Sequence, residues 1–340
     1  MASAQEQIAS LLRLEKNYVC SDYIGVHTSK RAKADERDLV HMLEEFANVV
    51  TDQSFTKSNN ANERKECTSS SSSPKSSVRK SPSFASLHDV QEVHRLNKAI
   101  SPSGTSTPNS TLPPRDFLFW RQQMYDWACL VVDSFSIERE IVAIAFNLLD
   151  RYVAKEEAKS LNNHPNLVIT RDDFQLFCMT CLYLAVKVME PFPRKISIQA
   201  LVDMSRGFYT AKDITVTESE ILETLGWHIH PPTSLSFCRL FWQLFPSGVT
   251  AKMRATCGCL TDIALTDGFF IPCKASHIAL ASVIQAARAE GMPEANVQSF
   301  LESMRETFKE ADNLMLRNEK NSEPSDLKAV YRQLEILHNQ

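Results

Sequence analysis

Apolar residues recur every three or four positions along most of the chain, the spacing that places them on one face of an α-helix. No useful length of sequence alternates as a strand does. Pro231 and Pro232 interrupt the helical pattern, because consecutive prolines cannot continue a helix. The pattern predicts an all-α protein with two consecutive bundles of about five helices. The expected helices span 115–133, 138–154, 171–189, 196–202 and 211–225, then 234–244, 250–267, 274–289, 293–309 and 323–340.

The N-terminal region has helical spacing of its own. Within 1–20, Ile8, Leu11 and Leu12 share one face of a short amphipathic helix. A second helix is predicted at 35–50, where Asp35 is a suitable N-cap.

The pattern stops between residues 51 and 112. Residues 68–86 read TSSSSSPKSSVRKSPSFAS, and so few apolar side chains cannot offset the entropy lost on folding. We expect a disordered linker. It contains four Ser/Thr-Pro pairs, which begin at Ser73, Ser81, Ser101 and Thr107. Two interpretations stay open: phosphorylation by a proline-directed kinase, which would make this a phosphoprotein, or a linker composition without that role.

Composition narrows the classes of function. The net charge of −4 and the pI of about 6.2 argue against bulk binding to nucleic acid or to an anionic membrane. The sequence contains no run of apolar residues long enough to span a bilayer and no secretory pattern at its start, so we expect a reducing compartment. The pair Cys178 and Cys181 lies within an apolar helical stretch, which favours buried thiols over a metal site.

Enzyme chemistry has no support in the motifs. We find no Gly-rich phosphate loop, no H-E-x-x-H and no G-x-S-x-G. His228 and His230 lack further ligands nearby in the sequence. We therefore predict a non-catalytic protein that needs no cofactor and no metal.

Several short motifs occur in order between residues 115 and 310. They are Trp120, Arg121, Met124, Asp126 and Trp127; Asn147, Asp150 and Arg151; Leu184, Ala185 and Lys187, with Glu190 and Pro191 after them; Glu218; and Leu225 to Thr233. In this order and spacing they resemble the cyclin family. The resemblance implies the two-bundle cyclin fold, with an N-terminal cyclin box at 113–230 and a C-terminal cyclin fold at 231–312. Apolar spacing and composition add an N-terminal helical segment at 1–50, a linker at 51–112 and a C-terminal tail or helix at 313–340.

The resemblance also implies a kinase-binding groove. In cyclins, the residues that match Lys187 and Glu218 flank a groove and bind the regulatory helix of a cyclin-dependent Ser/Thr kinase, which carries a PSTAIRE-like motif. The matching apolar lining is Leu184, Val188, Ile221 and Leu222, with Glu190 close by. Spacing alone favours a simpler interpretation, in which Lys187 is a lysine that reaches solvent along an apolar helix and Glu218 is an exposed acid.

Two further sets of residues follow from the same resemblance. Arg121 and Asp150 match a buried ion pair that joins the first two helices of the box. An exposed patch for R-x-L-type substrates or inhibitors matches Trp120, Met124 and Trp127. Trp120 stands where a Met is usual and Gln123 where an apolar residue is usual, which leaves the R-x-L specificity open.

The function implied is that of a regulatory subunit that activates a cyclin-dependent kinase and promotes cell-cycle progression. The alternative is a transcription-associated cyclin or a cyclin-fold adaptor, for which a DNA-binding version would need a basic face. We expect the protein in the nucleus and cytoplasm. The small cluster Lys30, Arg31 and Lys33 is either an import signal or a solvated surface.

Overall fold

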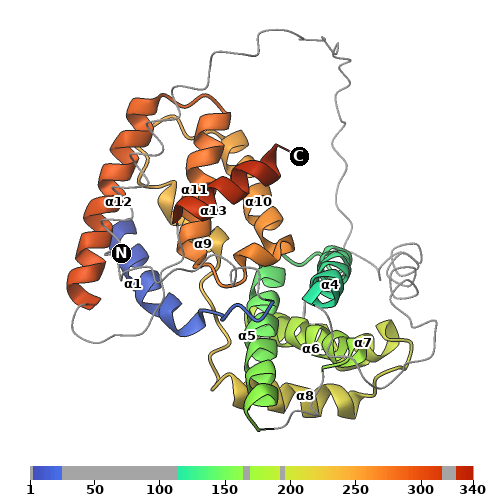
Figure 1. The fold of residues 1–340 in the computed structure, drawn as a ribbon. Helices are drawn as coiled ribbons and strands as arrows, with labels where there is room; N and C mark the ends of the chain where they lie inside the picture. The colour runs from blue at the N-terminus through green and yellow to red at the C-terminus, as the bar shows by residue number, and fades with distance from the viewer. Residues whose placement is uncertain (1–2, 25–113, 164–168, 192–195, 316–326, 340) are drawn as a thin grey trace, which may run out of the picture.

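The computed structural model describes residues 3–24, 114–163, 169–191, 196–315 and 327–339. The predicted helix at 35–50, the linker at 51–112 and the phosphorylation candidates Ser73, Ser81, Ser101 and Thr107 lie outside the described residues. Within them, every regular element is an α-helix or a short 3-10 helix, which confirms the all-α prediction (Figure 1). None of the described helices is long and apolar enough to cross a membrane.

The first bundle is formed by five consecutive helices. They are α4 (Pro114–Ser134), α5 (Glu140–Asn163), α6 (Arg171–Met189), α7 (Ile198–Met204) and α8 (Ala211–Thr224). Helix α5 packs along α6, and α6 also contacts α4 and α8 (Figure 1). The predicted order of elements is confirmed, although α5 continues nine residues beyond the predicted end at 154. That extension, KEEAKSLNN, consists largely of hydrophilic residues that favour helix, so apolar spacing could not reveal it.

The second bundle follows Pro231 and Pro232, as predicted. It contains α9 (Ser234–Phe241), α10 (Ala251–Thr266), α11 (Ala275–Ala289), α12 (Glu294–Met315) and α13 (Leu327–His338). Helix α11 is central: every residue from 276 to 287 is buried, and α9, α10, α12 and α13 all contact it. Its many small alanines allow such close packing on all sides.

Threonine caps fix where four of these helices begin. Each side-chain oxygen accepts a hydrogen bond from the backbone N–H three residues on, which satisfies a donor that the helix leaves unpaired. The capping residues are Thr170 for α6, Thr210 for α8, Thr233 for α9 and Thr250 for α10.

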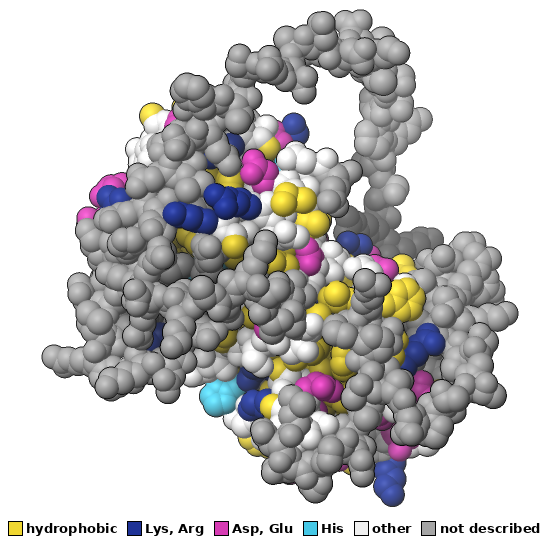
Figure 2. Space-filling model, viewed as in Figure 1, with side chains coloured by type: hydrophobic (Ala, Val, Ile, Leu, Met, Phe, Trp, Pro, Cys, Tyr) yellow, Lys and Arg dark blue, Asp and Glu magenta, His cyan; other side chains and the backbone are white. Residues whose placement is uncertain are grey.

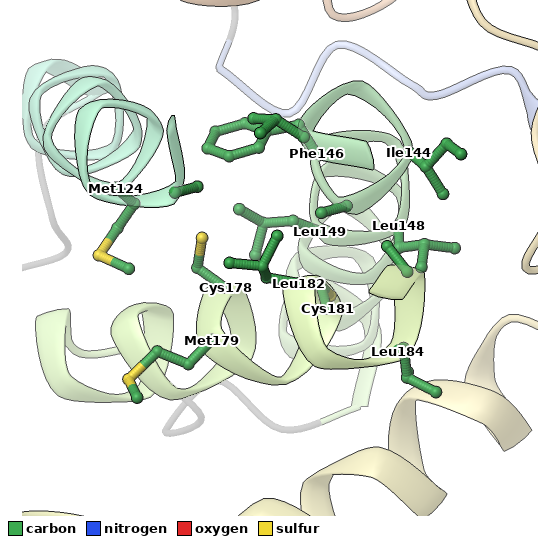
Figure 3. Packing of buried hydrophobic residues seen from close by; sticks show 14 of the residues in the cluster. Met124, Ile144, Phe146, Leu148, Leu149, Cys178, Met179, Cys181, Leu182 and Leu184 are labelled. Carbon is green, nitrogen blue, oxygen red and sulfur yellow. The ribbon is translucent and has the colours of Figure 1, made fainter. Parts of the chain in front are cut away.

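The core of the first bundle lies between α4, α5 and α6. Figure 3 shows Phe146 and Leu149 of α5 directed toward Met124 of α4 and Cys178 of α6. Cys178 and Cys181 are buried in this core, and burial raises the pKa of both thiols. A raised pKa keeps them protonated and unreactive, in line with the structural role predicted for them.

The N-terminal segment connects the two bundles. Helix α1 (Ala4–Glu15) packs against α9 and α12 and buries Ile8 and Leu12 in the core of the second bundle. The chain then crosses the first bundle, where the Asn147 amide donates to the Tyr18 carbonyl and the Tyr23 hydroxyl donates to Asp150. In Figure 1 this segment runs from α1 across the upper part of α5. The amphipathic helix predicted within 1–20 is therefore confirmed.

Candidate functional site

Lys187 and Glu218 meet at the surface between α6 and α8. The Lys187 Nζ lies 2.8 Å from Glu218 Oε1, and the side chains are 50% and 11% exposed. The hydrogen bond to Glu218 raises the pKa of Lys187, so its ammonium stays charged at neutral pH. An ammonium has three N–H donors, and a carboxylate accepts several hydrogen bonds. The pair therefore keeps donors and acceptors for a partner's backbone.

Exposed apolar side chains lie next to this pair in the sequence. Val188 and Met189 end α6 and are both exposed, and Leu222 on α8 is partly buried. Leu184 and Ile221 differ from the prediction, because both are buried in the core of the first bundle and do not line a surface groove. They support the helices that carry the exposed residues.

Glu190 closes the C-terminal end of α6. Its backbone N–H donates to the Val186 carbonyl, and the residue is buried apart from about a tenth of its surface. Its predicted part in kinase binding stays a prediction.

Trp227 is a candidate that sequence reasoning did not select. It follows α8, is 68% exposed, and has a φ of 62°, while Gly226 before it has a φ of 59°. A left-handed backbone is costly for a bulky residue and is often kept where a function requires it. The available signal was an aromatic residue one position before the His-Ile-His-Pro-Pro break.

Arg121 and Asp150 form a buried, two-bond ion pair between α4 and α5. Arg121 Nε donates to Asp150 Oδ1 at 3.0 Å, and Nη2 donates to Oδ2 at 2.9 Å. Burial acts to lower the pKa of Arg121, but the charge and hydrogen bonds of Asp150 outweigh it and raise the pKa. Arg121 Nη1 also donates to the Leu265 carbonyl of α10. The arginine thus ties three helices and both bundles together.

The predicted docking patch is largely closed. Met124 is 2% exposed and Trp127 1% exposed, so the expectation of an exposed stripe is wrong for both. Trp120 is partly exposed, and its ring packs against Phe117 and Phe174. These neighbouring rings of α4 and α6 cover part of Trp120. The role in substrate docking stays a prediction that rests mainly on Trp120.

Metal-ligating side chains do not form a cluster among the described residues. No group of three or more His, Cys, Asp or Glu in that part of the chain is arranged to hold a metal ion. His228 packs edge-on against the Tyr18 ring, and its carbonyl accepts a hydrogen bond from Arg151. Its position is explained by the packing of the N-terminal segment on the first bundle.

Figure 2 shows one face of the molecule. On the coloured part of this face, acidic and basic side chains are interspersed among apolar ones and do not gather by sign.

Comparison with known proteins places these features in a family. The model of the cyclin N-terminal domain matches residues 109–230, and the model of the cyclin C-terminal domain matches residues 232–336. The two matches adjoin at the Pro231–Pro232 break and include both bundles.

Individual relatives are more distant. The chain is 29% identical over 152 residues to G1/S-specific cyclin-E of Drosophila melanogaster, which covers 45% of this chain and 20% of that protein. It is 26% identical over 205 residues to G2/mitotic-specific cyclin-2 of Medicago sativa, which covers 60% of this chain and 58% of that protein. Each match thus spans less than two thirds of the relative's length. A viral cyclin from herpesvirus saimiri aligns with a TM-score of 0.46 at 14% identity, covering 73% of this chain and 97% of the other.

Proposed function

This chain belongs to the cyclin family, and we propose that it is a regulatory subunit that binds and activates a cyclin-dependent Ser/Thr kinase in the cell cycle. Its similarity to cyclins named for the G1/S and G2/mitotic phases supports a cell-cycle role over a transcriptional one. Catalysis would belong entirely to the kinase.

The observation that carries the proposal is the Lys187–Glu218 pair. A charged pair at a helix junction, with half of the lysine exposed and Val188 and Met189 beside it in the chain, offers both polar anchors and apolar area. A helix from a partner can bury its apolar face there while its backbone groups bond to the ammonium and the carboxylate. Trp227, which is exposed just beyond α8, is a second candidate for contact with the kinase, because large aromatic side chains often dominate interface energies.

Activation follows from where such a helix would be held. A kinase is active when its regulatory helix lies inward, so that the helix's glutamate pairs with the ATP-binding lysine. A rigid surface that binds only the inward position shifts the kinase toward that state, because a ligand favours the conformation it binds more tightly. The buried Arg121–Asp150 pair joins α4 to α5, and threonine caps fix where α6 and α8 begin, which favours one arrangement of the helices that carry this surface.

The test combines the purified chain with a panel of PSTAIRE-type kinases and measures phosphorylation of a Ser-Pro peptide. We expect activation by the wild-type chain, and its loss when Lys187→Glu is combined with Glu218→Lys. Lost interface anchors often cost more than about 2 kcal/mol, or roughly thirtyfold in affinity.

A matched control lies in the second bundle. Lys252 and Glu290 are also 2.8 Å apart, with an exposed lysine and a largely buried glutamate. Reversing this pair with Lys252→Glu and Glu290→Lys should leave activation unchanged. Failure of the folded wild-type chain to activate any kinase in the panel would instead favour the adaptor function.

A further inference from the structure

The turn that follows α8 presents Trp227 to solvent. This exit turn consists of residues 225–228, and Trp227 within it is 68% exposed. Gly226 and Trp227 both have a left-handed backbone, with φ of 59° and 62°. Such a backbone is costly for tryptophan and persists only where surrounding contacts hold it. One of these contacts is local, since the Trp227 N–H donates to the Leu222 carbonyl of α8 at 3.0 Å. Others come from outside the helix.

Two cations of α5 reach the end of α8 and the exit turn. Lys155 Nζ donates to the carbonyl of Thr224, the last residue of α8, at 2.7 Å. Arg151 Nη1 donates to the carbonyl of His228, the last residue of the exit turn, at 2.8 Å. Residues four apart lie on the same face of a helix, so both side chains approach from one side of α5. Because the last carbonyls of a helix lack partners within it, positive donors are favoured there.

Arg151 differs from Lys155 in being buried. It is 6% exposed and forms no ion pair with any described residue. Burial lowers the pKa of Arg151. A buried cation without an anion is costly. The guanidinium carbon lies 4.9 Å from the centroid of the Tyr18 ring, and this cation–π contact offsets part of the cost.

The Tyr18 ring also contacts the exit turn. It meets the His228 ring edge-on, with centroids 6.0 Å apart. The Tyr18 carbonyl accepts a hydrogen bond from the Asn147 amide of α5, which fixes the N-terminal segment on the first bundle. Arg151 thus contacts the N-terminal segment and the exit turn at once.

We propose that Arg151 is a positioning residue for kinase docking: its bond to the His228 carbonyl fixes the direction in which Trp227 projects. The inference rests on the proposed function, in which Trp227 is a candidate for contact with the kinase. Arg151 itself is buried, so it acts through Trp227 and not by touching the kinase. A contact that is already held in its binding geometry loses less entropy when a partner binds, which accounts for a costly buried cation at this place.

The first experiment observes Trp227 directly. The full chain has four tryptophans, and fluorotryptophan labelling gives each a fluorine NMR signal, of which Trp227→Gly identifies one. Arg151→Met keeps an unbranched side chain but removes the donors and the charge. We expect it to shift the Trp227 signal toward its position in the denatured chain. Arg288→Met removes another arginine that contacts a tyrosine, in the second bundle, and should leave the signal unchanged.

The second experiment measures the affinity for a kinase that the wild-type chain activates, by titration calorimetry. Arg151→Met should weaken binding at least about fivefold, because a hydrogen bond from a charged group no longer holds the exit turn. In the Trp227→Gly background the same change should cost less than about twofold, because the residue that Arg151 positions is gone. Arg151→Lys, which keeps the charge and a donor, should recover part of the affinity lost in Arg151→Met.

The outcomes separate this inference from the proposed function. An unchanged Trp227 signal in Arg151→Met, or equal losses of affinity in the wild-type and Trp227→Gly backgrounds, would overturn the positioning role alone. Equal losses of affinity in Arg151→Met and Arg288→Met would show general destabilisation and would also overturn it. A folded wild-type chain that binds no kinase would overturn the proposed function and this inference with it, even where the Trp227 signal shifts in Arg151→Met.

Discussion

Both bundles consist of helices packed around a central helix, but they differ in how completely that helix is covered. In the second bundle, α11 is covered on every side by α9, α10, α12 and α13, and α1 is added from the far end of the sequence. In the first bundle, α6 ends in three exposed residues, Lys187, Val188 and Met189. The second bundle thus completes its own core, and the first leaves a face open.

This difference indicates different roles for the two bundles. Helix α11 carries small and branched apolar residues that only another helix can cover. Both helices have a basic residue in the last turn, but Arg288 of α11 is 20% exposed and pairs with Glu294, whereas Lys187 of α6 is 50% exposed. The open face of the first bundle is therefore suited to a second protein, whereas the second bundle stabilises the arrangement.

Hydrogen bonds between residues of the first and the second bundle keep the two bundles in one orientation. Glu140 at the start of α5 accepts hydrogen bonds from Thr233 and Arg239, which belong to the start of the second bundle. Arg121 reaches the Leu265 carbonyl from the other side. These bonds are directional, so the seam has one preferred geometry.

The largest expected effect comes from breaking the first bundle's ion pair. Arg121→Ala leaves the Asp150 carboxylate buried without its cation, which should lower the free energy of unfolding by about 3–5 kcal/mol. Chemical denaturation measures this. The exposed pair Arg139–Asp133, with its 2.6 Å contact, is the control, and Arg139→Ala should cost less than about 1 kcal/mol. Equal costs for the two variants would contradict the role given to Arg121.

The next effect tests whether α1 belongs to the second bundle. Ile8 is fully buried there, and Ile8→Ala should lower the free energy of unfolding by about 2–4 kcal/mol, because it leaves a cavity. Leu14 lies on the same helix and is exposed, so Leu14→Ala should change it by less than about 0.5 kcal/mol. A cost for Ile8→Ala as small as that for Leu14→Ala would show that α1 is not part of this core.

Trp227 sharpens the contrast between stability and recognition. Trp227→Gly places a residue that tolerates the left-handed backbone, so the stability should change by less than about 1 kcal/mol. Kinase binding should weaken at least about tenfold, since a large aromatic surface is lost. Ile336→Ala on α13, also exposed, should leave binding intact. Titration calorimetry with an activated kinase distinguishes these outcomes.

The smallest effect concerns pH. Glu15 accepts two hydrogen bonds from Ser276 at the start of α11, but burial raises the pKa of its carboxyl above the ordinary 4.5. The folded chain thus holds this proton more tightly than the unfolded chain. The group's contribution to stability is complete below pH 4.5 and is lost as the pH rises through the folded pKa. In the Glu15→Gln variant, the free energy of unfolding measured across this pH range should not show that decrease. A variant with the same pH profile as the wild type would show that Glu15 is not the cause of the decrease.

Much of the fold was predictable from the sequence. The apolar spacing located all the described α-helices but not the short 3-10 helix Gly268–Phe270, and the paired prolines located the boundary between the bundles. The spacing missed the last nine residues of α5, because they are mostly hydrophilic and show no apolar pattern. The site was predictable in part: family-like motifs identified Lys187 and Glu218, which the structure brings to 2.8 Å, and also Arg121 and Asp150.

Exposure was the property that the sequence pattern could not supply. Met124 and Trp127 occupy positions of an expected surface patch, but both are buried in the core of the first bundle. Leu184 and Ile221 belong to the same core, although the sequence placed them along a groove. Trp227 is instead exposed, and both it and the preceding Gly226 have a left-handed backbone.

The sequence by itself determined the helical class, the order of the helices, the division into two bundles and the family. These depend on local spacing, caps and breaks, which act within a few residues of each other. Only the tertiary structure decided that α1 completes the second bundle and that Asp150 binds both Arg121 and Tyr23. These features join residues far apart in the chain, and their geometry follows from how whole helices pack against one another.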